Sequence, residues 1–143
     1  MEKTPEDSCV SVVGIVVYNC ECLFIKRTKE PLNWCPPCGS LRVGESITEG
    51  LKREIREETA LDVDIVMPVT TWSGVHNSQD ILSITFVCWA QSSDVKLSDE
   101  HEDFRWISLK KLSQASIHTD FDTTKWPHFV AVAKYFEELE EVK

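Results

Sequence analysis

The alternation of hydrophobic and polar positions predicts a series of strands interrupted by one helix of clear periodicity. Residues 10–18 are rich in valine and isoleucine, which is typical of a buried strand. After a turn that begins at Asn19, residues 22–26 form the returning strand. Prolines and glycines at residues 28–44 and polar, acidic residues at 92–103 predict loops. The remaining predicted strands are residues 62–69, 70–74, 81–90 and 104–107, with Pro68 at a bend or a sheet edge.

The predicted helix runs from about residue 47 to residue 58. Ile47, Leu51 and Ile55 recur every four residues and form one apolar stripe. Ser46 followed by Glu49 fits a capping box, in which the serine hydroxyl accepts a hydrogen bond from the backbone N–H three residues on.

Two further helices are predicted near the C-terminus. A short one opens at residues 108–112, and a longer one covers residues 127–140, with Pro127 in its first turn. The longer helix places four apolar residues at helical spacing, namely Phe129, Val130, Ala133 and Phe136. This order of elements predicts an α/β fold with a mixed sheet between helices, and the length of 143 residues predicts a single domain over residues 1–143.

Three glutamates on the central helix are the most informative candidate site. Glu54, Glu57 and Glu58 are spaced i, i+3 and i+4, so they project from one side of the helix and repel one another. A cation between them would relieve that repulsion, and carboxylate oxygens suit Mg²⁺ or Mn²⁺ better than zinc. From periodicity alone, a solvated acidic helix face explains the same pattern equally well.

The residues around this helix resemble the signature box of the Nudix hydrolases. The segment GSLRVGESITEGLKREIREETAL, residues 39–61, is similar to the pattern G-x5-E-x7-R-E-U-x-E-E-x-G-U, where U is an aliphatic residue. It matches at every specified position except Ala60, which replaces the second glycine. Because so many positions match at fixed spacing, the resemblance favours the metal site over the solvated face. It implies the α/β/α sandwich of that family, with a central mixed sheet.

The resemblance also implies roles for the residues of the box. Glu54, Glu57 and Glu58 are expected to bind the metal and, with Arg53, to form the catalytic centre. Glu45 and Gly39 are expected to support that centre without binding the metal.

Two positions depart from the family pattern. Alanine at position 60 lacks the conformational freedom of glycine, so we expect the turn after the helix to differ slightly. Cys38 stands where the family usually has glycine. The resemblance implies that a backbone carbonyl of this turn helps to hold the metal, and cysteine still supplies that carbonyl.

Several residues outside the box have both a functional and an ordinary interpretation. In the nucleoside-triphosphate branch, a glutamate at about the position of Glu100 reaches the metal, and Glu102 is its close competitor. Arg27 either meets a phosphate or forms a surface ion pair. Trp34 and Trp72 either stack on a base or pack in the core. His76 and His101 are loop residues that either assist proton transfer or have no functional role.

The six cysteines allow a competing hypothesis of redox or zinc chemistry. Cys35 and Cys38 form a CxxC pair, and Cys20 and Cys22 precede it. Reduced thiols in the cytoplasm are the favoured interpretation, because the N-terminal segment MEKTPEDSCV has no apolar run typical of a signal peptide and no segment is long enough to span a membrane.

The net charge of −9 narrows the range of ligands that we expect the protein to bind. An acidic protein repels nucleic acid at long range, so the expected partner is a small nucleotide that arrives with divalent cations. The resemblance implies a MutT-like, Mg²⁺-dependent pyrophosphohydrolase that cleaves a nucleoside triphosphate to the monophosphate and pyrophosphate, with Mn²⁺ as an alternative ion. The alternative substrate is an ADP-sugar or a dinucleoside polyphosphate. The alternative function is that of a regulator that binds a nucleotide without cleaving it. A homodimer is possible, because two-fold assembly is common among members of this family.

Overall fold

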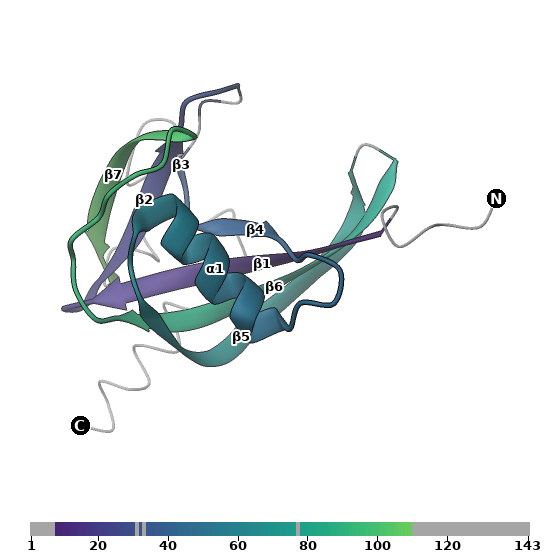
Figure 1. Cartoon of the computed structure of the whole chain (residues 1–143), viewed down its shortest axis with the longest axis horizontal. Helices are drawn as coiled ribbons and strands as arrows, with labels where there is room; N and C mark the ends of the chain where they lie inside the picture. The colour runs from purple at the N-terminus through teal and green to yellow at the C-terminus, as the bar shows by residue number, and fades with distance from the viewer. Residues whose placement is uncertain (1–7, 31, 33, 77, 110–143) are drawn as a thin grey trace.

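The computed structural model describes residues 8–30, 32, 34–76 and 78–109, and these residues form a mixed sheet with one helix against it (Figure 1). The seven strands follow the order β3-β2-β1-β6-β5, with β4 paired to β1 and β7 paired to β2. Only the pairing of β1 with β6 is parallel among these strands. The elements are β1 (Ser8–Tyr18), β2 (Glu21–Arg27), β3 (Trp34–Cys35), β4 (Cys38–Ser40), α1 (Ile47–Thr59), β5 (Val63–His76), β6 (Gln79–Ala90) and β7 (His101–Ser108).

One edge of β1 is shared by two different strands. Near its C-terminal end β1 pairs with β2, where Val17 lies opposite Cys22. Nearer its N-terminus it pairs with β4, where Val12 lies opposite Gly39. Between these two regions the backbone N–H of Gly14 donates to the carbonyl of Pro37 at 2.9 Å. The sheet therefore divides along β1, and this division places β4 beside the helix.

Buried side chains alternate between the two faces of the sheet, as the period of a strand requires. On the face that α1 covers, Leu51 and Ile55 of the helix pack with strand residues such as Val12 and Val16. On the opposite face a second cluster forms around Phe24, which is fully buried. The central strands are thus buried on both faces. The helix predicted at residues 127–140 lies outside the described residues, and so does all of the predicted 108–112 helix beyond residue 109.

The strand predictions need three corrections. Residues 62–69 and 70–74 form one strand, β5, whose pairing with β6 shifts register on both sides of the segment from Met67 to Pro68. The predicted loop at residues 28–44 contains β3, which pairs with the preceding strand β2, and β4, which pairs with the more distant β1. The predicted loop at residues 92–103 ends early, because β7 begins at His101. Pro68 does lie on the edge strand β5, as predicted.

The bounds of α1 and its N-terminal cap agree with the prediction, whereas the turn after the helix does not. Ser46 caps the helix by accepting a hydrogen bond from the N–H of Glu49 at 3.2 Å. Ile47 is 36% exposed, so the apolar stripe is confirmed only for the other two positions, which are buried. Ala60 adopts the left-handed conformation, with φ 62°. The expectation of a different turn was wrong, because the alanine takes the backbone conformation that suits glycine there.

Among the described residues, α1 is the one helix, and its 13 residues are too few and too polar to cross a lipid bilayer.

We predict that Ala60→Gly stabilises the protein by about 1 kcal/mol, because glycine adopts a positive φ without the steric cost that alanine bears. Urea unfolding should show a higher midpoint with an unchanged slope. The control is Lys52→Gly in the middle of α1, where glycine should instead cost about 1 kcal/mol. A loss of stability in Ala60→Gly would contradict the left-handed conformation.

Candidate functional site

A cavity of about 1050 Å³ lies between β4, α1 and the turn before β7. It collects most of the site residues that the sequence predicts. Those that line it are Arg27, Cys38, Gly39, Arg53, Glu54, Glu57, Glu58 and Glu100. Glu45 lies directly behind this wall, bound to Arg53.

Arg53 joins the acidic residues of the box. Its Nε and Nη2 atoms donate to the two carboxylate oxygens of Glu45 at 2.6 and 2.9 Å. Its Nη1 atom donates to Glu54 at 3.0 Å and to Glu57 at 3.2 Å. The Arg53 side chain is only 18% exposed, and this hydrogen bonding holds the pKa of Glu45 down at about 2. The guanidinium group therefore fixes the orientation of three carboxylates.

Gly39 lets the carboxylate of Glu54 approach β4. A Cβ atom added at position 39 would overlap the carboxylate carbon and both carboxylate oxygens of Glu54. Any side chain at this position would push Glu54 away from the cavity wall, so the first glycine of the box supplies space.

Glu58 is in a different environment from the other two box glutamates. It is 8% exposed, and its Oε1 atom accepts a hydrogen bond from the backbone N–H of Cys38 at 2.9 Å. Burial, with the charge of neighbouring groups, raises the pKa of Glu58 to about 9. Burial also raises the pKa of Glu54, although Arg53 opposes that change. Without a cation, Glu58 therefore carries a proton at neutral pH.

The segment before β7 is tied to the C-terminal end of α1. The N–H groups of Lys96 and Ser98 donate to the carbonyls of Thr59 and Glu58 at 2.9 and 3.2 Å. Thr28, just after β2, donates from its N–H and from its hydroxyl to the carbonyl of Glu100. These bonds hold the backbone of residue 100 beside Glu58.

Glu100 and Glu102 have different surroundings, although they are close in sequence. Glu102 lies outside the cavity and forms an ion pair of 3.6 Å with Lys26, whereas Glu100 lines the cavity. Of the two candidates, only Glu100 is therefore placed to act with the box glutamates.

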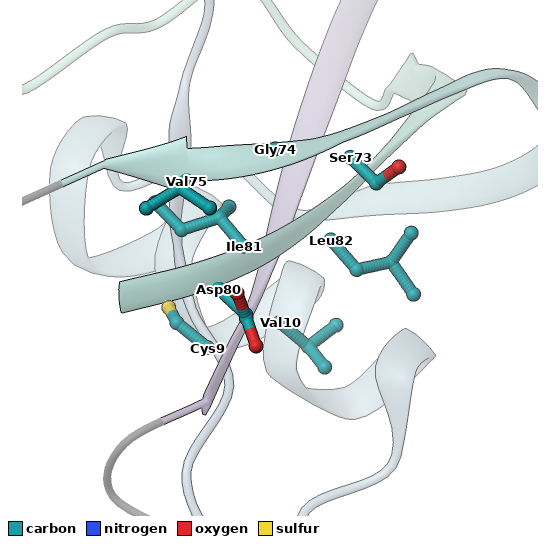
Figure 2. A pocket seen from close by; sticks show the side chains of 8 residues that line it. All are labelled: Cys9, Val10, Ser73, Gly74, Val75, Asp80, Ile81 and Leu82. Carbon is teal, nitrogen blue, oxygen red and sulfur yellow. The ribbon is translucent and has the colours of Figure 1, made fainter. Parts of the chain in front are cut away.

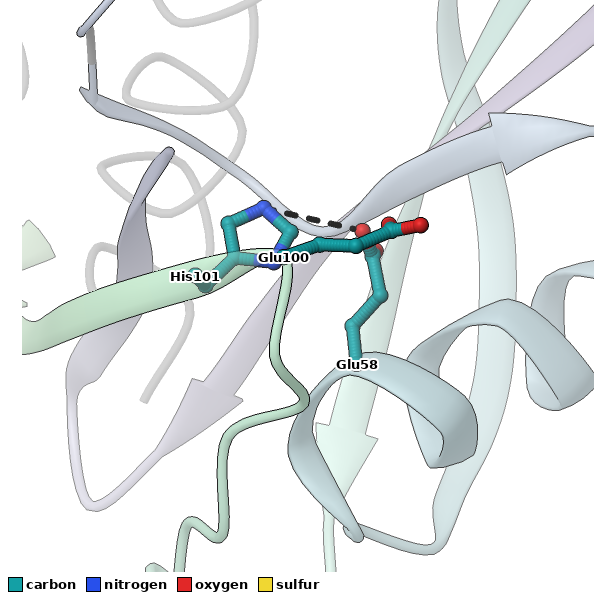
Figure 3. Close-up of side chains that lie close together, drawn as sticks. All are labelled: Glu58, Glu100 and His101. Carbon is teal, nitrogen blue, oxygen red and sulfur yellow. Dashed lines mark ion pairs between the residues drawn. The ribbon is translucent and has the colours of Figure 1, made fainter. Parts of the chain in front are cut away.

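His101 also lines the cavity, a position that the sequence alone does not indicate. The sequence suggests a loop residue that assists proton transfer or is idle, whereas His101 begins β7 and its side chain is only 6% exposed. Its Nε2 atom lies 3.7 Å from Oε2 of Glu58, and burial lowers its pKa, so the ring is neutral at neutral pH. One ligand atom each from Glu58, Glu100 and His101 lies within 4.8 Å of the others (Figure 3). The pairing of β7 with β2, which buries the histidine, has no local signal in the sequence.

The two tryptophans proposed for base stacking do not line this cavity. Trp34 is 3% exposed and packs in the core cluster around Phe24, where Arg105 lies over its ring at 5.2 Å. Trp72 is 55% exposed on β5. Of the two interpretations of Trp34, its position in the structure favours core packing over base stacking. His76 ends β5, far along the chain from the box.

The cysteines do not assemble a zinc site in the described part of the chain. All six are free thiols, and none belongs to a group of three or more potential metal ligands there. The thiols of Cys35 and Cys38 contact each other at the cavity wall, where the hydrogen bond from Cys38 lowers the pKa of Cys35. Cys20 is exposed and Cys22 is buried, so they do not share one environment.

A second cavity, of about 430 Å³, lies against the ends of β1, β5 and β6 (Figure 2). Its lining is mostly apolar and includes Val10, Val75, Ile81 and Leu82. None of the predicted site residues lines it, and Asp80 is its one ionisable carboxylate. The first cavity is therefore the candidate active site.

The donors of the candidate active site fit a divalent cation. Glu58 is a buried carboxyl group whose charge the protein alone does not compensate, and Glu100 adds a second carboxylate. Glu54 and Glu57 line the same cavity, so they are available to further ions or to the substrate's own cation. Hard oxygen donors in this number are typical of Mg²⁺ or Mn²⁺ sites.

Comparison with known proteins identifies the class. Residues 10–127 match the family model of the NUDIX domain, so the chain belongs to the NUDIX family. It is 31% identical over 111 residues to an ADP-ribose pyrophosphatase of Methanocaldococcus jannaschii, covering 72% of this chain and 63% of that protein. It is 26% identical over 100 residues to the nucleoside triphosphatase NudI of Escherichia fergusonii, covering 62% of this chain and 70% of that protein.

Solved structures of this family confirm the α/β fold. The MutT protein of Methanosarcina mazei Go1 superposes with a TM-score of 0.76 at 22% identity, over 94% of this chain and 99% of that one. An Ap4A hydrolase of C. elegans superposes with a TM-score of 0.72 at 16% identity, again over 94% and 99% of the two chains. The class of the protein is therefore the NUDIX family, and the chain spans 63% of the length of the ADP-ribose pyrophosphatase that it matches.

We predict that the metal-free protein loses stability as the pH rises from about 5 to about 9. Glu58 keeps its proton in the folded chain up to a pKa of about 9 and loses it near 4.5 on unfolding, so higher pH favours the unfolded state. The free energy of unfolding should fall by at most about 1.4 kcal/mol per pH unit. Urea unfolding in EDTA measures this slope.

Glu58→Gln tests the assignment, because the amide keeps an oxygen for the N–H of Cys38 but cannot titrate. Its slope over this pH range should be clearly smaller, whereas Glu49→Gln on the first turn of α1 should behave like the original protein. Equal slopes in all three proteins would contradict the assignment.

We predict that Gly39→Ala weakens divalent-cation binding about tenfold or more, because the new Cβ displaces the carboxylate of Glu54. Mn²⁺ titration followed by electron paramagnetic resonance measures the dissociation constant. Lys52→Ala on α1 is the control and should leave it unchanged. Unchanged affinity in Gly39→Ala would show that the position of Glu54 does not matter for the ion.

Proposed function

We propose that this protein is an Mg²⁺-dependent pyrophosphohydrolase that cleaves a nucleoside triphosphate to the nucleoside monophosphate and pyrophosphate, with Mn²⁺ as an alternative ion. The observation that carries the proposal is the meeting of four glutamates on one cavity that Arg27 also lines. The four are Glu54, Glu57, Glu58 and Glu100.

The size and charge of the cavity suit a nucleotide bound together with cations. A volume of about 1050 Å³ is enough for a nucleotide with its phosphates. The glutamates alone would repel a polyphosphate, so the substrate needs divalent ions to enter. Arg27, Lys29 and Arg42 also line the cavity and offer positive charge to the phosphate oxygens. This mixture of acids and bases favours a cation–phosphate complex as ligand.

The residues that line the cavity have different roles in the proposed hydrolysis. When bound, a divalent cation neutralises charge on the phosphate oxygens and makes water a better nucleophile. Glu54, Glu57, Glu58 and Glu100 would supply the oxygens that hold the divalent cations, and the carbonyl of Cys38 is a further candidate donor. One of the glutamates accepts the proton of the attacking water as that water approaches phosphorus in line. Arg53 keeps the carboxylates oriented through its bonds to Glu45, Glu54 and Glu57.

A second candidate substrate is a diphosphate-linked compound of the ADP-ribose type. The relative with 31% identity is described as an ADP-ribose pyrophosphatase, and the same cavity chemistry applies to any phosphoric anhydride. A nucleotide-binding regulator without activity is the third alternative, and the presence of all three box glutamates argues against it. The free cysteines support a reducing, cytoplasmic setting for the protein.

We predict that a panel assay with Mg²⁺ gives the highest kcat/KM for a nucleoside triphosphate. The panel contains the eight common ribo- and deoxyribonucleoside triphosphates, ADP-ribose and a dinucleoside polyphosphate, and chromatography identifies the products. Monophosphate and pyrophosphate should appear in equal amounts. Preference for ADP-ribose would transfer the assignment to the second candidate, and binding without turnover of any compound would support the regulator.

The matched variants for this assay are Glu57→Gln and Glu49→Gln, which remove one carboxylate each from the same helix. Glu57 faces the cavity and Glu49 lies in the first turn. Glu57→Gln should lower kcat at least about a hundredfold with an unchanged unfolding midpoint. Glu49→Gln should keep its activity. Full activity in Glu57→Gln would remove this residue from the site.

A further inference from the structure

The buried imidazole of His101 is not hydrogen-bonded to Glu58, and its Nδ1 atom has no hydrogen-bonding partner among the described residues. The side chain is 6% exposed, and Nδ1 has no partner in the structure. Nε2 lies 3.7 Å from Oε2 of Glu58, which is too long for a hydrogen bond. Leaving a buried polar group unpaired costs about 1–3 kcal/mol. An apolar side chain would fill this space at lower cost, so simple packing does not explain the histidine.

The distance between His101 and Glu58 is short enough for both side chains to bind one ion. Ligand atoms held about 2.1 Å from an octahedral ion lie about 3.0 Å apart as neighbours and about 4.2 Å apart across the ion. The 3.7 Å gap falls between these values. Glu100 provides the third ligand atom, and all three ligand atoms lie within 4.8 Å of one another. Figure 3 shows the ring and the two carboxylates gathered between the end of α1 and the start of β7.

The backbone around this group is held in place from three directions. The N–H of Ser98 donates to the carbonyl of Glu58, and the N–H of His101 donates to the carbonyl of Ser98, both at 3.2 Å. Thr28 holds the carbonyl of Glu100 from the β2 side. Glu100 itself is exposed, so its side chain can turn toward an ion while the other two ligands stay fixed. The three donors are therefore largely positioned before an ion arrives.

We propose that His101 is a direct nitrogen ligand of a divalent cation that Glu58 and Glu100 also bind. This inference rests on the proposed function, which places a cation among the glutamates, and it adds a ligand outside the signature box. An imidazole nitrogen favours borderline cations over Mg²⁺. This position of the site consequently binds Mn²⁺ more tightly than Mg²⁺, and the remaining glutamates are left to the cation that accompanies the phosphates.

The test uses Mn²⁺ alone, added to the full chain, and needs no turnover. Electron spin echo envelope modulation detects ¹⁴N directly bound to Mn²⁺. The modulation should be present, and it should change to the ¹⁵N pattern when the protein is made with ¹⁵N-histidine. Mn²⁺ bound without nitrogen modulation would overturn the role of His101 and leave the proposed function standing. Failure of Mn²⁺ to bind at all would overturn both proposals.

Two variants sharpen the result. His101→Gln removes the ring and should abolish the nitrogen modulation, with a loss of Mn²⁺ affinity of about tenfold and a smaller loss of Mg²⁺ affinity. Glu102→Gln changes a neighbouring side chain that lies outside the cavity and pairs with Lys26, so its modulation and affinity should match the original protein. Nitrogen modulation that persists in His101→Gln would contradict the proposal. If His101→Gln does not fold, the isotope experiment on the original chain decides the question by itself.

Discussion

The candidate active site depends on one partly buried guanidinium group. Glu54 and Glu57 lie on the same side of α1 and repel each other, yet both accept a hydrogen bond from the same Nη1 atom of Arg53. The other side of the guanidinium makes two hydrogen bonds to Glu45. Because the Arg53 side chain is largely removed from water, these charge-assisted bonds are stronger than surface ion pairs. They orient the carboxylates before any ligand is bound, which limits the reorganisation that catalysis would require.

The pKa values of Glu45 and Glu58, two glutamates of the box, are shifted in opposite directions. Glu45, bound to Arg53, has a pKa of about 2, whereas Glu58 has a pKa of about 9 in the absence of a cation. Both are glutamates of one signature box, so their environments produce the difference. Glu58 is close to the core that Leu51 and Ile55 form, and it receives only a backbone N–H. A divalent ion compensates a buried carboxylate of this kind, which explains why the box presents one glutamate on the core side.

Short-range sequence patterns predicted the parts of the site that depend on residues within about four positions of one another. The cap at Ser46 and the shared helix side of Glu54 and Glu57 follow from helical spacing, which reaches only four residues. The sequence left the roles of His101 and Trp34 open, because cross-strand pairing decides where both side chains lie. His101 lies opposite Arg27 on β2, a partner 74 residues away in the sequence, and this pairing buries it.

The sequence by itself determined the helix, its cap, the side on which the acidic residues project and the kind of chemistry they support. These properties depend on residue type and short spacing, and both can be seen in the linear chain. Tertiary structure alone decided that Glu100 and His101 lie beside Glu58. It also decided that the backbone N–H of Cys38 donates to the carboxyl group of Glu58 and that Gly39 leaves space for the carboxylate of Glu54. These contacts depend on the pairing of β4 with β1, on the pairing of β7 with β2 and on the bonds from Lys96 and Ser98 to the end of α1. Such pairing depends on the packing of the whole sheet, and no single segment encodes it.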